Sequence, residues 1–289
     1  MPADAHRYNI GDIEVTVLTD GFRMVTVDDK YIRNAGTAEI AAALAAAGLP
    51  TDRIKNTYSP IVLTAAGRRV LIDTGNGEAA LQQSNGERGT LGQSLAAAGI
   101  DRGAIDIVAI SHFHADHVNG LLTADNRPAF PNAEIKVPEV EWKFWMDDGA
   151  MSRATPGRMT ELFANNRRVF DALGRKVTPY AWDEEVVPGV IAVGTPGHSI
   201  GHTSYIVASG GQRVFVQQDV CNNFVLFTRH PGWHGFFDQD PAQAEATRRR
   251  IYDMLAADRL PVQAYHFPFP ALMAVEKAGD GYRVTPTTV

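Results

Sequence analysis

Short runs in which apolar and polar residues alternate mark the predicted strands in the first half of the chain. Residues 14–18 alternate in this way, as a strand with one buried face does. Residues 61–64 and 69–73 flank a Gly-containing turn at 66–67 and predict a hairpin. Residues 105–110 are almost entirely apolar, which predicts a buried strand that runs directly into a cluster of histidines.

Segments with helical character separate these strands, and the second half of the chain repeats the pattern. Residues 37–48, 91–98 and 160–173 predict helices. Asp240 and Pro241 begin a further helix, because Asp is a favoured N-cap and Pro is favoured at the first helical position. Five further segments are predicted strands: 134–137, 190–193, 203–207, 213–216 and 262–266.

This order of elements predicts one α/β domain over residues 1–289. No low-complexity linker or short-period repeat divides the chain. Two sheets packed face to face and covered by helices, a four-layer αββα sandwich, suit the order. Mixed strands and helices alone would also suit other α/β layouts.

The composition restricts the partners and the compartment. The formal net charge is −6, from 27 basic and 33 acidic residues, which gives no attraction to nucleic acid or anionic lipid. Cys221 is the single cysteine, so no intrachain disulfide can form. No apolar run approaches the roughly 20 residues of a membrane helix, and residues 1–7 lack the apolar stretch of a secretory signal. We therefore expect a cytoplasmic protein without nucleic-acid or membrane partners.

A cluster of metal-ligand residues follows the strand predicted at 105–110. His112, His114, Asp116 and His117 occupy six consecutive positions, and imidazole and carboxylate are the usual ligands of open zinc sites. Residues two apart in an extended segment point the same way, so His112 and His114 can reach one ion. Asp116 and His117 follow where the chain turns into a helix and can face a second ion. Four such residues in so short a segment indicate two ions.

Three further ligand-type residues stand at the ends of predicted strands downstream. His198 lies in a Gly/Pro turn, Asp219 follows the strand at 213–216, and His266 ends the strand at 262–266. Strand ends are where open α/β architectures place their chemistry.

The order His-x-His-x-Asp-His, Thr-Pro-Gly-His, Asp and His resembles the signature of the metallo-β-lactamase superfamily. The resemblance extends from about Tyr58 to Pro270 and implies the αββα sandwich with a dinuclear metal site. By motif position, it implies a first ion held by His112, His114 and His198, a second held by Asp116, His117 and His266, and Asp219 as the bridge.

The resemblance also assigns roles around the ions. Asp73 resembles the family's buried carboxylate that orients a metal ligand, although a simple turn residue is the alternative. His202 is expected to support the site rather than to bind metal. Zinc is the first choice for these ligands, with iron, manganese or cobalt as alternatives. A homodimer is common in the methyl parathion hydrolase branch of the superfamily, so the resemblance allows one.

The expected mechanism is hydrolysis without a protein nucleophile. Two ions roughly 3.5–4 Å apart can share a water and lower its pKa toward about 7, giving a bridging hydroxide. The chain has no Gly-x-Ser-x-Gly elbow. Asp116 is the candidate catalytic residue, because it could take or relay a proton after attack while also binding metal.

The substrate is less sharply defined than the metal site. Quorum-signal lactonases of the superfamily carry a Tyr three residues after the bridging Asp, where this chain has Asn222. Residues 266–270 and 281–284 are similar to the methyl parathion hydrolase branch, which implies an organophosphate triester, lactone or carboxylic ester as substrate. Candidate substrate contacts are Asn222, Trp142, Phe224, Trp233 and Phe267.

Three alternatives remain open. A glyoxalase-II-like thioesterase should carry basic residues near its C-terminus, and no such cluster follows Arg259. A β-lactamase-type amide hydrolase is usually exported. A metal-containing regulator that binds a small molecule without turnover is the non-enzymatic alternative, and the complete set of ligand residues argues against it.

Overall fold

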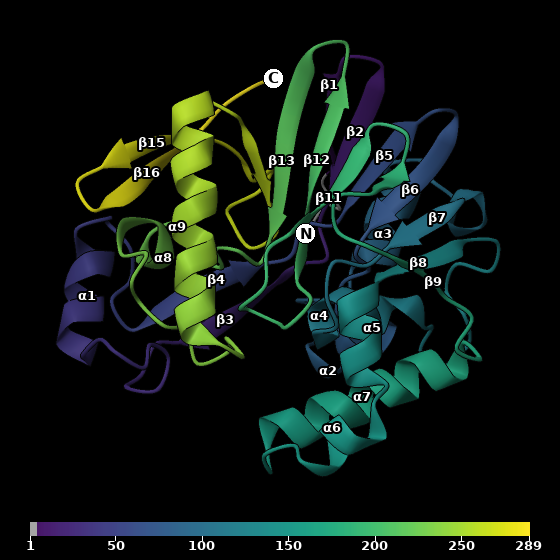
Figure 1. Ribbon diagram of the computed structural model, residues 1–289, viewed down its shortest axis with the longest axis horizontal. Coiled ribbons are helices and arrows are strands. Elements are labelled where there is room, and N and C mark those ends of the chain that lie inside the picture. The colour runs from purple at the N-terminus through teal and green to yellow at the C-terminus, as the bar shows by residue number, and fades with distance from the viewer. Residues whose placement is uncertain (1–4) are drawn as a thin grey trace.

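The computed structural model describes residues 5–289, and in it two mixed seven-stranded sheets pack face to face (Figure 1). The strand order is β1-β2-β5-β6-β7-β8-β9 in the first sheet and β10 to β16 in numerical order in the second. The first sheet consists of β1 (Ala5–Ile10), β2 (Ile13–Leu18), β5 (Ile61–Ala65), β6 (Arg68–Ile72), β7 (Ile107–Ala109), β8 (Glu134–Pro138) and β9 (Thr178–Tyr180). The second consists of β10 (Glu185–Val187), β11 (Val190–Gly194), β12 (Thr203–Ser209), β13 (Gln212–Gln218), β14 (Val262–Ala264), β15 (Leu272–Ala278) and β16 (Gly281–Pro286). A separate ribbon pairs β3 (Phe22–Thr26) with β4 (Arg53–Thr57).

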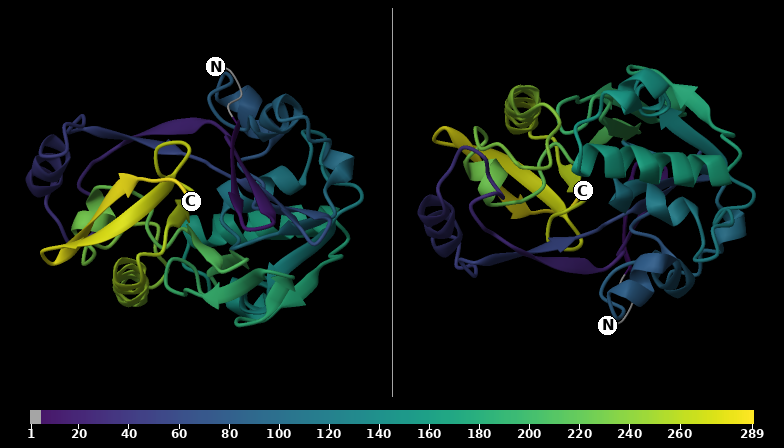
Figure 2. Two further views of the ribbon diagram at one scale, coloured as in Figure 1. Left: turned by 90° about the horizontal axis from the view of Figure 1, so that it is seen from above. Right: turned by 90° about the horizontal axis from the view of Figure 1, so that it is seen from below.

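Helices cover the outer faces of both sheets (Figures 1 and 2). On the side of the second sheet lie α1 (Thr37–Ala45), α8 (Leu226–Arg229) and α9 (Pro241–Asp258). On the side of the first sheet lie α2 (Glu78–Gln83), α3 (Leu91–Ala97), α4 (Ala115–Val118), α5 (Glu139–Trp145), α6 (Asp148–Ser152) and α7 (Arg158–Ala172), with short 3-10 helices at Arg102–Ala104 and Asn119–Leu121.

Three hydrophobic clusters fill the three spaces between these four layers. Val214 and Val216 of β13 belong to the cluster between the sheets, whereas Phe215 belongs to the cluster under α1, α8 and α9. Ile107 of β7 likewise faces the central cluster, and Val108 faces the cluster under α3, α5 and α7. Neighbouring residues of a strand point to opposite faces, so both strands are buried on both sides. This arrangement confirms the predicted αββα sandwich; the assignment of residues 1–289 to one domain stays a prediction.

Most predicted strands and helices are present, with differences at particular boundaries. The strand expected at 105–110 is only Ile107–Ala109. The strand expected at 262–266 ends at Ala264, so His266 lies in the turn that follows. The β3–β4 ribbon was not predicted, because its strands carry many exposed polar residues and resemble loops in the sequence.

The strand ends bring distant parts of the chain to one edge of the sandwich. Strands β6 and β7 are parallel, as are β13 and β14, so the loops after each pair emerge on the same side. The backbone leaves β6 and β13 in the left-handed region, with φ 58° at Asp73 and 50° at Gln218. For a non-glycine residue such a conformation costs about 1–3 kcal/mol and is common at functional sites. The two turns direct Asp73 and Asp219 toward this edge.

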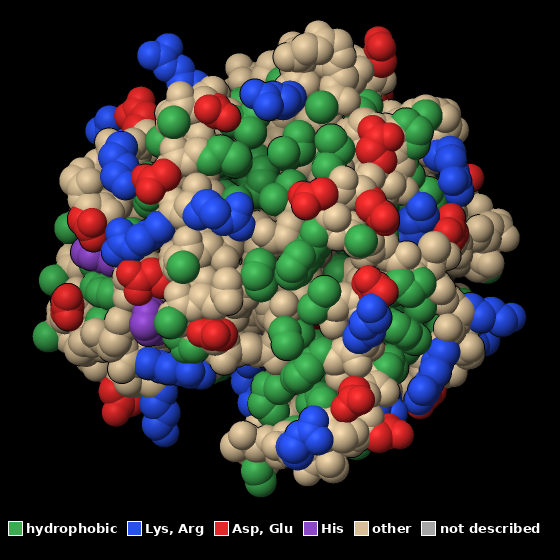
Figure 3. Space-filling model, in the orientation of Figure 1, with side chains coloured by type: hydrophobic (Ala, Val, Ile, Leu, Met, Phe, Trp, Pro, Cys, Tyr) green, Lys and Arg blue, Asp and Glu red, His purple; other side chains and the backbone are tan. Residues whose placement is uncertain are grey.

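No helix among residues 5–289 combines the length and apolarity needed to cross a membrane. On the face shown in Figure 3, acidic and basic side chains are interspersed rather than gathered into one large basic patch. The prediction that no secretory signal is present falls partly on residues 1–4, which lie outside the described residues.

Candidate metal centre

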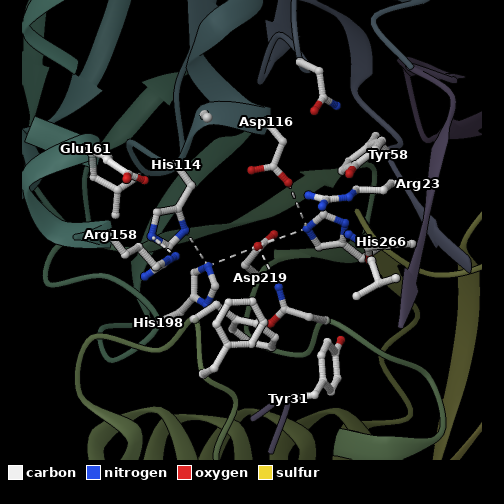
Figure 4. Close-up of a pocket in the computed structure, with 18 residues that line it drawn as sticks. Arg23, Tyr31, Tyr58, His114, Asp116, Arg158, Glu161, His198, Asp219 and His266 are labelled. Atoms are coloured by element: carbon white, nitrogen blue, oxygen red, sulfur yellow. Dashed lines mark hydrogen bonds and ion pairs between the residues drawn. The ribbon is translucent and has the colours of Figure 1, made fainter. Parts of the chain in front are cut away.

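Seven His and Asp side chains converge at this edge in two groups. The first group is His112, His114, His198 and Asp219, and the second is Asp116, His117 and His266. Within each group the ligand-type atoms all lie within 4.8 Å of one another. In Figure 4, Asp219 occupies the middle, with His114 and His198 on one side, His266 on the other, and Asp116 above it. The seven residues predicted as ligands are therefore brought together.

The local fold of the His-x-His-x-Asp-His segment explains how it reaches both groups. His112 and His114 follow β7 in extended backbone, and α4 begins at Ala115. The change to helix turns Asp116 and His117 away from His114, as the sequence predicted. The backbone amide and the hydroxyl of Thr74 both donate to the carbonyl of His117, at 2.9 and 2.7 Å, and hold the start of the helix against β6.

In the first group three imidazole nitrogens face one another. His114 Nδ1 lies 3.0 Å from His112 Nε2 and 2.8 Å from His198 Nε2. His198 Nε2 lies 3.2 Å from Asp219 Oδ2. A proton on His114 Nδ1 could form a hydrogen bond with only one of the two neighbouring imidazole nitrogens, because a neutral imidazole has a single N–H. A cation that accepts all the lone pairs fits this arrangement better.

In the second group the same carboxylate is approached from the other side. His266 Nε2 lies 3.1 Å from Asp219 Oδ2 and 3.6 Å from Asp116 Oδ2. His117 Nε2 lies 3.3 Å from Asp219 Oδ1, and both of these atoms are buried without a hydrogen-bond partner. Buried polar atoms without partners are rare and often indicate an absent ion or water. The residues present therefore fit a pair of metal ions that share Asp219.

The burial and the charges of these side chains also favour metal binding. Burial and the neighbouring imidazoles hold the pKa of His112 and of His114 well below the usual range, which keeps both rings neutral. Burial opposes a charge on His117, but Asp219, Asp73 and Asp116 outweigh it and raise its pKa well above the usual range. Positive charge is thus favoured where these carboxylates meet. Neutral imidazoles beside carboxylates are the donor set that zinc and related ions bind.

Asp73 lies under the second group, where it orients a candidate ligand. Its Oδ2 lies 2.6 Å from His117 Nδ1 and accepts from the hydroxyl of Ser111 at 2.7 Å. Its Oδ1 accepts from the backbone amide of Ser111 at 2.8 Å. A carboxylate on the outward nitrogen of a ligand imidazole fixes the tautomer with the inward lone pair free. The geometry supports the role expected for Asp73.

His202 supports Asp219 rather than joining either ligand group. Its Nε2 accepts from the backbone amide of Asp219 at 3.0 Å, and its Nδ1 lies 3.1 Å from the carbonyl of Thr195. Burial, with His198 nearby, lowers the pKa of His202 to about 3, so the ring stays neutral. Its bonds fix the backbone at the start of the turn that carries Asp219.

Glu141, which no sequence pattern indicated, is a fully buried carboxylate that joins the two ligand loops of the first group. It accepts from the backbone amides of Phe113 at 2.9 Å and Gly201 at 2.7 Å. It also accepts from Ser199 Oγ at 2.6 Å and Trp145 Nε1 at 2.7 Å. Burial raises the pKa of Glu141, and the four donors counteract that effect only in part. A lone Glu in an unpredicted helix gave no signal in the sequence.

Replacing Glu141 with Gln is expected to destabilise the fold by about 3 kcal/mol, because the amide cannot accept all four hydrogen bonds. Metal affinity should fall as well, by roughly tenfold or more, since the loops of His114 and His198 lose their common anchor. Chemical denaturation and metal titration measure the two effects. Glu139→Gln is the matched control, because Glu139 lies on an exposed part of α5. Equal behaviour of the two variants would contradict this role.

The two groups open into a cavity of about 620 Å³ (Figure 4). Five of the candidate ligands line it, whereas His112 and His117 are buried behind them. Its remaining wall includes Arg23, Tyr31, Asn56, Tyr58, Arg158, Asn222, Phe236 and Phe237. Of the five predicted substrate contacts, Asn222 alone is in this wall. Asn222 Nδ2 donates to Asp219 Oδ2 at 2.8 Å.

The other four predicted substrate contacts lie in hydrophobic packing and not in the cavity wall. Trp142 packs edge-to-face on Phe113 and Phe170 outside the first sheet. Trp233 and Phe267 belong to the cluster outside the second sheet, and the partly buried Phe224 packs against that cluster. Burial of their large apolar surfaces stabilises these positions, and the expectation that they contact a substrate stays a prediction.

The fold and the site together define an α/β protein with two adjoining metal-ligand groups at the strand ends. The sequence model described as the metallo-beta-lactamase superfamily matches residues 57–216, more than half of the chain. The chain belongs to this superfamily. Comparison with curated proteins gave no match.

Solved structures share the whole fold at low sequence identity. AidC, described as a dizinc quorum-quenching lactonase in complex with a product, aligns with a TM-score of 0.91 at 23% identity over 100% of this chain and 99% of its own. The hydrolase AbOPH aligns with a TM-score of 0.89 at 21% identity over 100% and 99%. A quorum-quenching N-acyl homoserine lactone lactonase aligns at 0.63 and 19% over 92% and 100%. At these identities the likeness establishes the fold.

Proposed function

We propose that this protein is a metal-dependent hydrolase that cleaves a lactone, a carboxylic ester or an organophosphate triester at a dinuclear centre. One observation carries the proposal: the buried Asp219 of the first ligand group also lies 3.1 Å from His266 and 3.3 Å from His117 of the second, and both groups open into a cavity large enough for a small organic molecule. Zinc is the first candidate for both ions, since five imidazoles and two carboxylates form the donor set.

The ligand assignment follows the geometry. His112, His114 and His198 would hold one ion, and Asp116, His117 and His266 the other, with Asp219 shared. When bound, the ions would supply Lewis acidity and a lowered pKa for water, which is the chemistry that ester hydrolysis needs at neutral pH.

Asp116 is the candidate group for moving a proton. It is the most exposed of the candidate ligands and lines the cavity, so its carboxylate is open to a substrate. Tyr265 donates to its backbone carbonyl at 2.7 Å and fixes its position. Asp116 would take a proton from the attacking water and, as the ester bond breaks, deliver it to the leaving oxygen.

The cavity wall favours a substrate with an apolar portion. Tyr31, Phe236 and Phe237 form an aromatic group, with ring centroids 5.8 Å apart for Tyr31 and Phe236 and 6.0 Å for Tyr31 and Phe237. Phe237 also lies 5.5 Å from the ring of His198. A lactone with an acyl chain, or a triester with an aryl leaving group, presents such a portion next to an electrophilic centre. The fold neighbours AidC, a dizinc quorum-quenching lactonase, and AbOPH, a hydrolase, are compatible with this choice.

Two neighbouring aromatic residues should separate substrate binding from packing. Phe236→Ala, in the cavity wall, is expected to raise KM several-fold with little loss of stability, because 41% of Phe236 is exposed. Trp233→Ala, in the packed cluster, should cost about 3 kcal/mol of stability and leave KM unchanged. Steady-state kinetics and thermal denaturation measure both; the reverse pattern would show that Trp233 contacts the substrate.

A hydrolysis panel on the metal-reconstituted protein tests the proposed function. It contains an aryl lactone, an acyl-homoserine lactone, an aryl ester, paraoxon, a cephalosporin and a glutathione thioester, with His114→Ala as the inactive control. Metal-dependent turnover of a lactone, ester or triester, lost in the variant, is the expected result. Turnover confined to the thioester or the cephalosporin would replace the proposal with a glyoxalase-II-like or β-lactamase-type activity. No turnover with both metal ions bound would favour a small-molecule-binding regulator.

A further inference from the structure

The outward ring nitrogen of His114 has a different environment from those of the other candidate ligand histidines. His117 Nδ1 and His198 Nδ1 face carboxylates, at 2.6 Å from Asp73 and 2.9 Å from Asp238. His266 Nδ1 lies 2.9 Å from a backbone carbonyl, and His112 Nδ1 lies 3.0 Å from the hydroxyl oxygen of Ser111, whose proton goes to Asp73. Each of these four rings therefore has an acceptor for its outward N–H.

The outward nitrogen of His114 faces a cation instead. Its Nε2 lies 3.2 Å from Nη2 of Arg158, the first residue of α7. The inward Nδ1 of His114 points at His112 and His198, so its lone pair is the one directed into the ligand group. A neutral imidazole with an inward Nδ1 lone pair carries its proton on Nε2, and a guanidinium has donors only. Two donors therefore face each other, and neither satisfies the other.

The surroundings of Arg158 leave its donors available to a ligand. It is half-buried, lines the cavity, and forms no ion pair with any of residues 5–289. Three acidic residues line the cavity with it: Glu161, one turn further along α7, and the candidate ligands Asp116 and Asp219. Figure 4 shows Arg158 beside His114, on the same side of Asp219 as the first ligand group. An acceptor from the cavity can therefore reach Arg158 and the His114 N–H together.

We propose that Arg158 and the outward N–H of His114 bind an anionic oxygen of the acid that hydrolysis releases. This proposal rests on the proposed function. Hydrolysis of an ester breaks the acyl C–O bond, adds water, and yields an alcohol and a carboxylic acid that loses its proton to solvent; a lactone yields both groups in one hydroxy acid. A triester would yield a phosphodiester anion by the same balance. Carboxylate and phosphodiester share a pair of anionic oxygens, which guanidinium recognises through its planar fork.

Direct binding of product acids tests the proposal without turnover. Hexanoate and diethyl phosphate are titrated separately by calorimetry into the metal-loaded wild type, Arg158→Met, Arg158→Lys and Arg153→Met. Arg153 is the matched control, because it is exposed and lies just before α7 but outside the cavity wall. Arg158→Met should weaken binding of the acid by about tenfold or more, since a charge-assisted hydrogen bond is lost. Arg158→Lys should weaken it less, and Arg153→Met should leave it unchanged.

The comparison of the two acids identifies the source of the anion. Arg158-dependent binding of hexanoate supports an ester or lactone substrate, and Arg158-dependent binding of diethyl phosphate supports a triester. Equal binding by wild type and Arg158→Met at full metal content would overturn the proposal, as would wild type that binds neither acid. Loss of metal from Arg158→Met would also overturn it, because Arg158 would then maintain His114 rather than bind a ligand.

Failure of this inference can be distinguished from failure of the proposed function by comparing the acid-binding experiment with the hydrolysis panel. Turnover with binding of acids that does not depend on Arg158 would leave the proposed function standing and reject this inference. Binding that depends on Arg158 without turnover of any substrate would reject the proposed hydrolase and retain an anion site.

Discussion

Asp219→Asn is expected to lower kcat/KM by at least about a thousandfold, which corresponds to about 4 kcal/mol of lost transition-state stabilisation. The reason is the position of its carboxylate, which lies within hydrogen-bonding range of His198 and His266 and close to His117. An amide would be neutral and would place N–H groups against these imidazoles. Metal content should fall from two ions per chain to one or none.

The control for this variant is the same Asp-to-Asn substitution at a position outside the site. Asp253→Asn removes an exposed carboxylate that pairs with Lys277, and it should leave kcat/KM and metal content unchanged. Kinetics on the best substrate of the panel and elemental analysis supply both readouts. An Asp219→Asn variant that retained two ions and normal turnover would show that the two ligand groups do not depend on a shared carboxylate.

Removal of metal should both destabilise the fold and abolish activity. An ion present at a thousand times its dissociation constant adds about 4 kcal/mol to stability, so two ions would add roughly 8 kcal/mol. Without them, buried atoms such as His117 Nε2 and Asp219 Oδ1 have no partner. A chelator should lower Tm by roughly 10 °C or more, and activity should be lost with it.

Restoration distinguishes metal loss from damage to the protein. Zinc, manganese or cobalt added in excess of the chelator should return both Tm and activity, and the metal that restores most activity identifies the best fit to the site. A Tm that is the same with chelator and with zinc would contradict the presence of a metal centre.

The metal-ligand residues were predictable because their spacing is local and their order is specific. His112 and His114 lie in one extended segment, and the turn into α4 at Ala115 separates them from Asp116 and His117. The sequence also indicated that further ligands stand at strand ends, because short apolar strands precede them. The four layers followed from the alternation of strands and helices, together with the resemblance.

The residues that support and surround the site were not predictable in the same way. Glu141 and Arg158 reach it from helices whose sequences carry no motif, and only tertiary packing brings them to Phe113 and His114. The layer that each aromatic residue faces was not predictable for a related reason. Trp142 and an aromatic residue of the cavity wall have the same hydrophobic character, and the sequence does not show which layer each one faces.

The most direct test of the account is the number of metal ions bound per chain, measured by elemental analysis on protein reconstituted with zinc and freed of excess metal. A dinuclear centre predicts two ions per chain in the wild type, fewer in Asp219→Asn, and two in Asp253→Asn. One ion or none in the wild type under these conditions would contradict the dinuclear centre on which the proposed function depends.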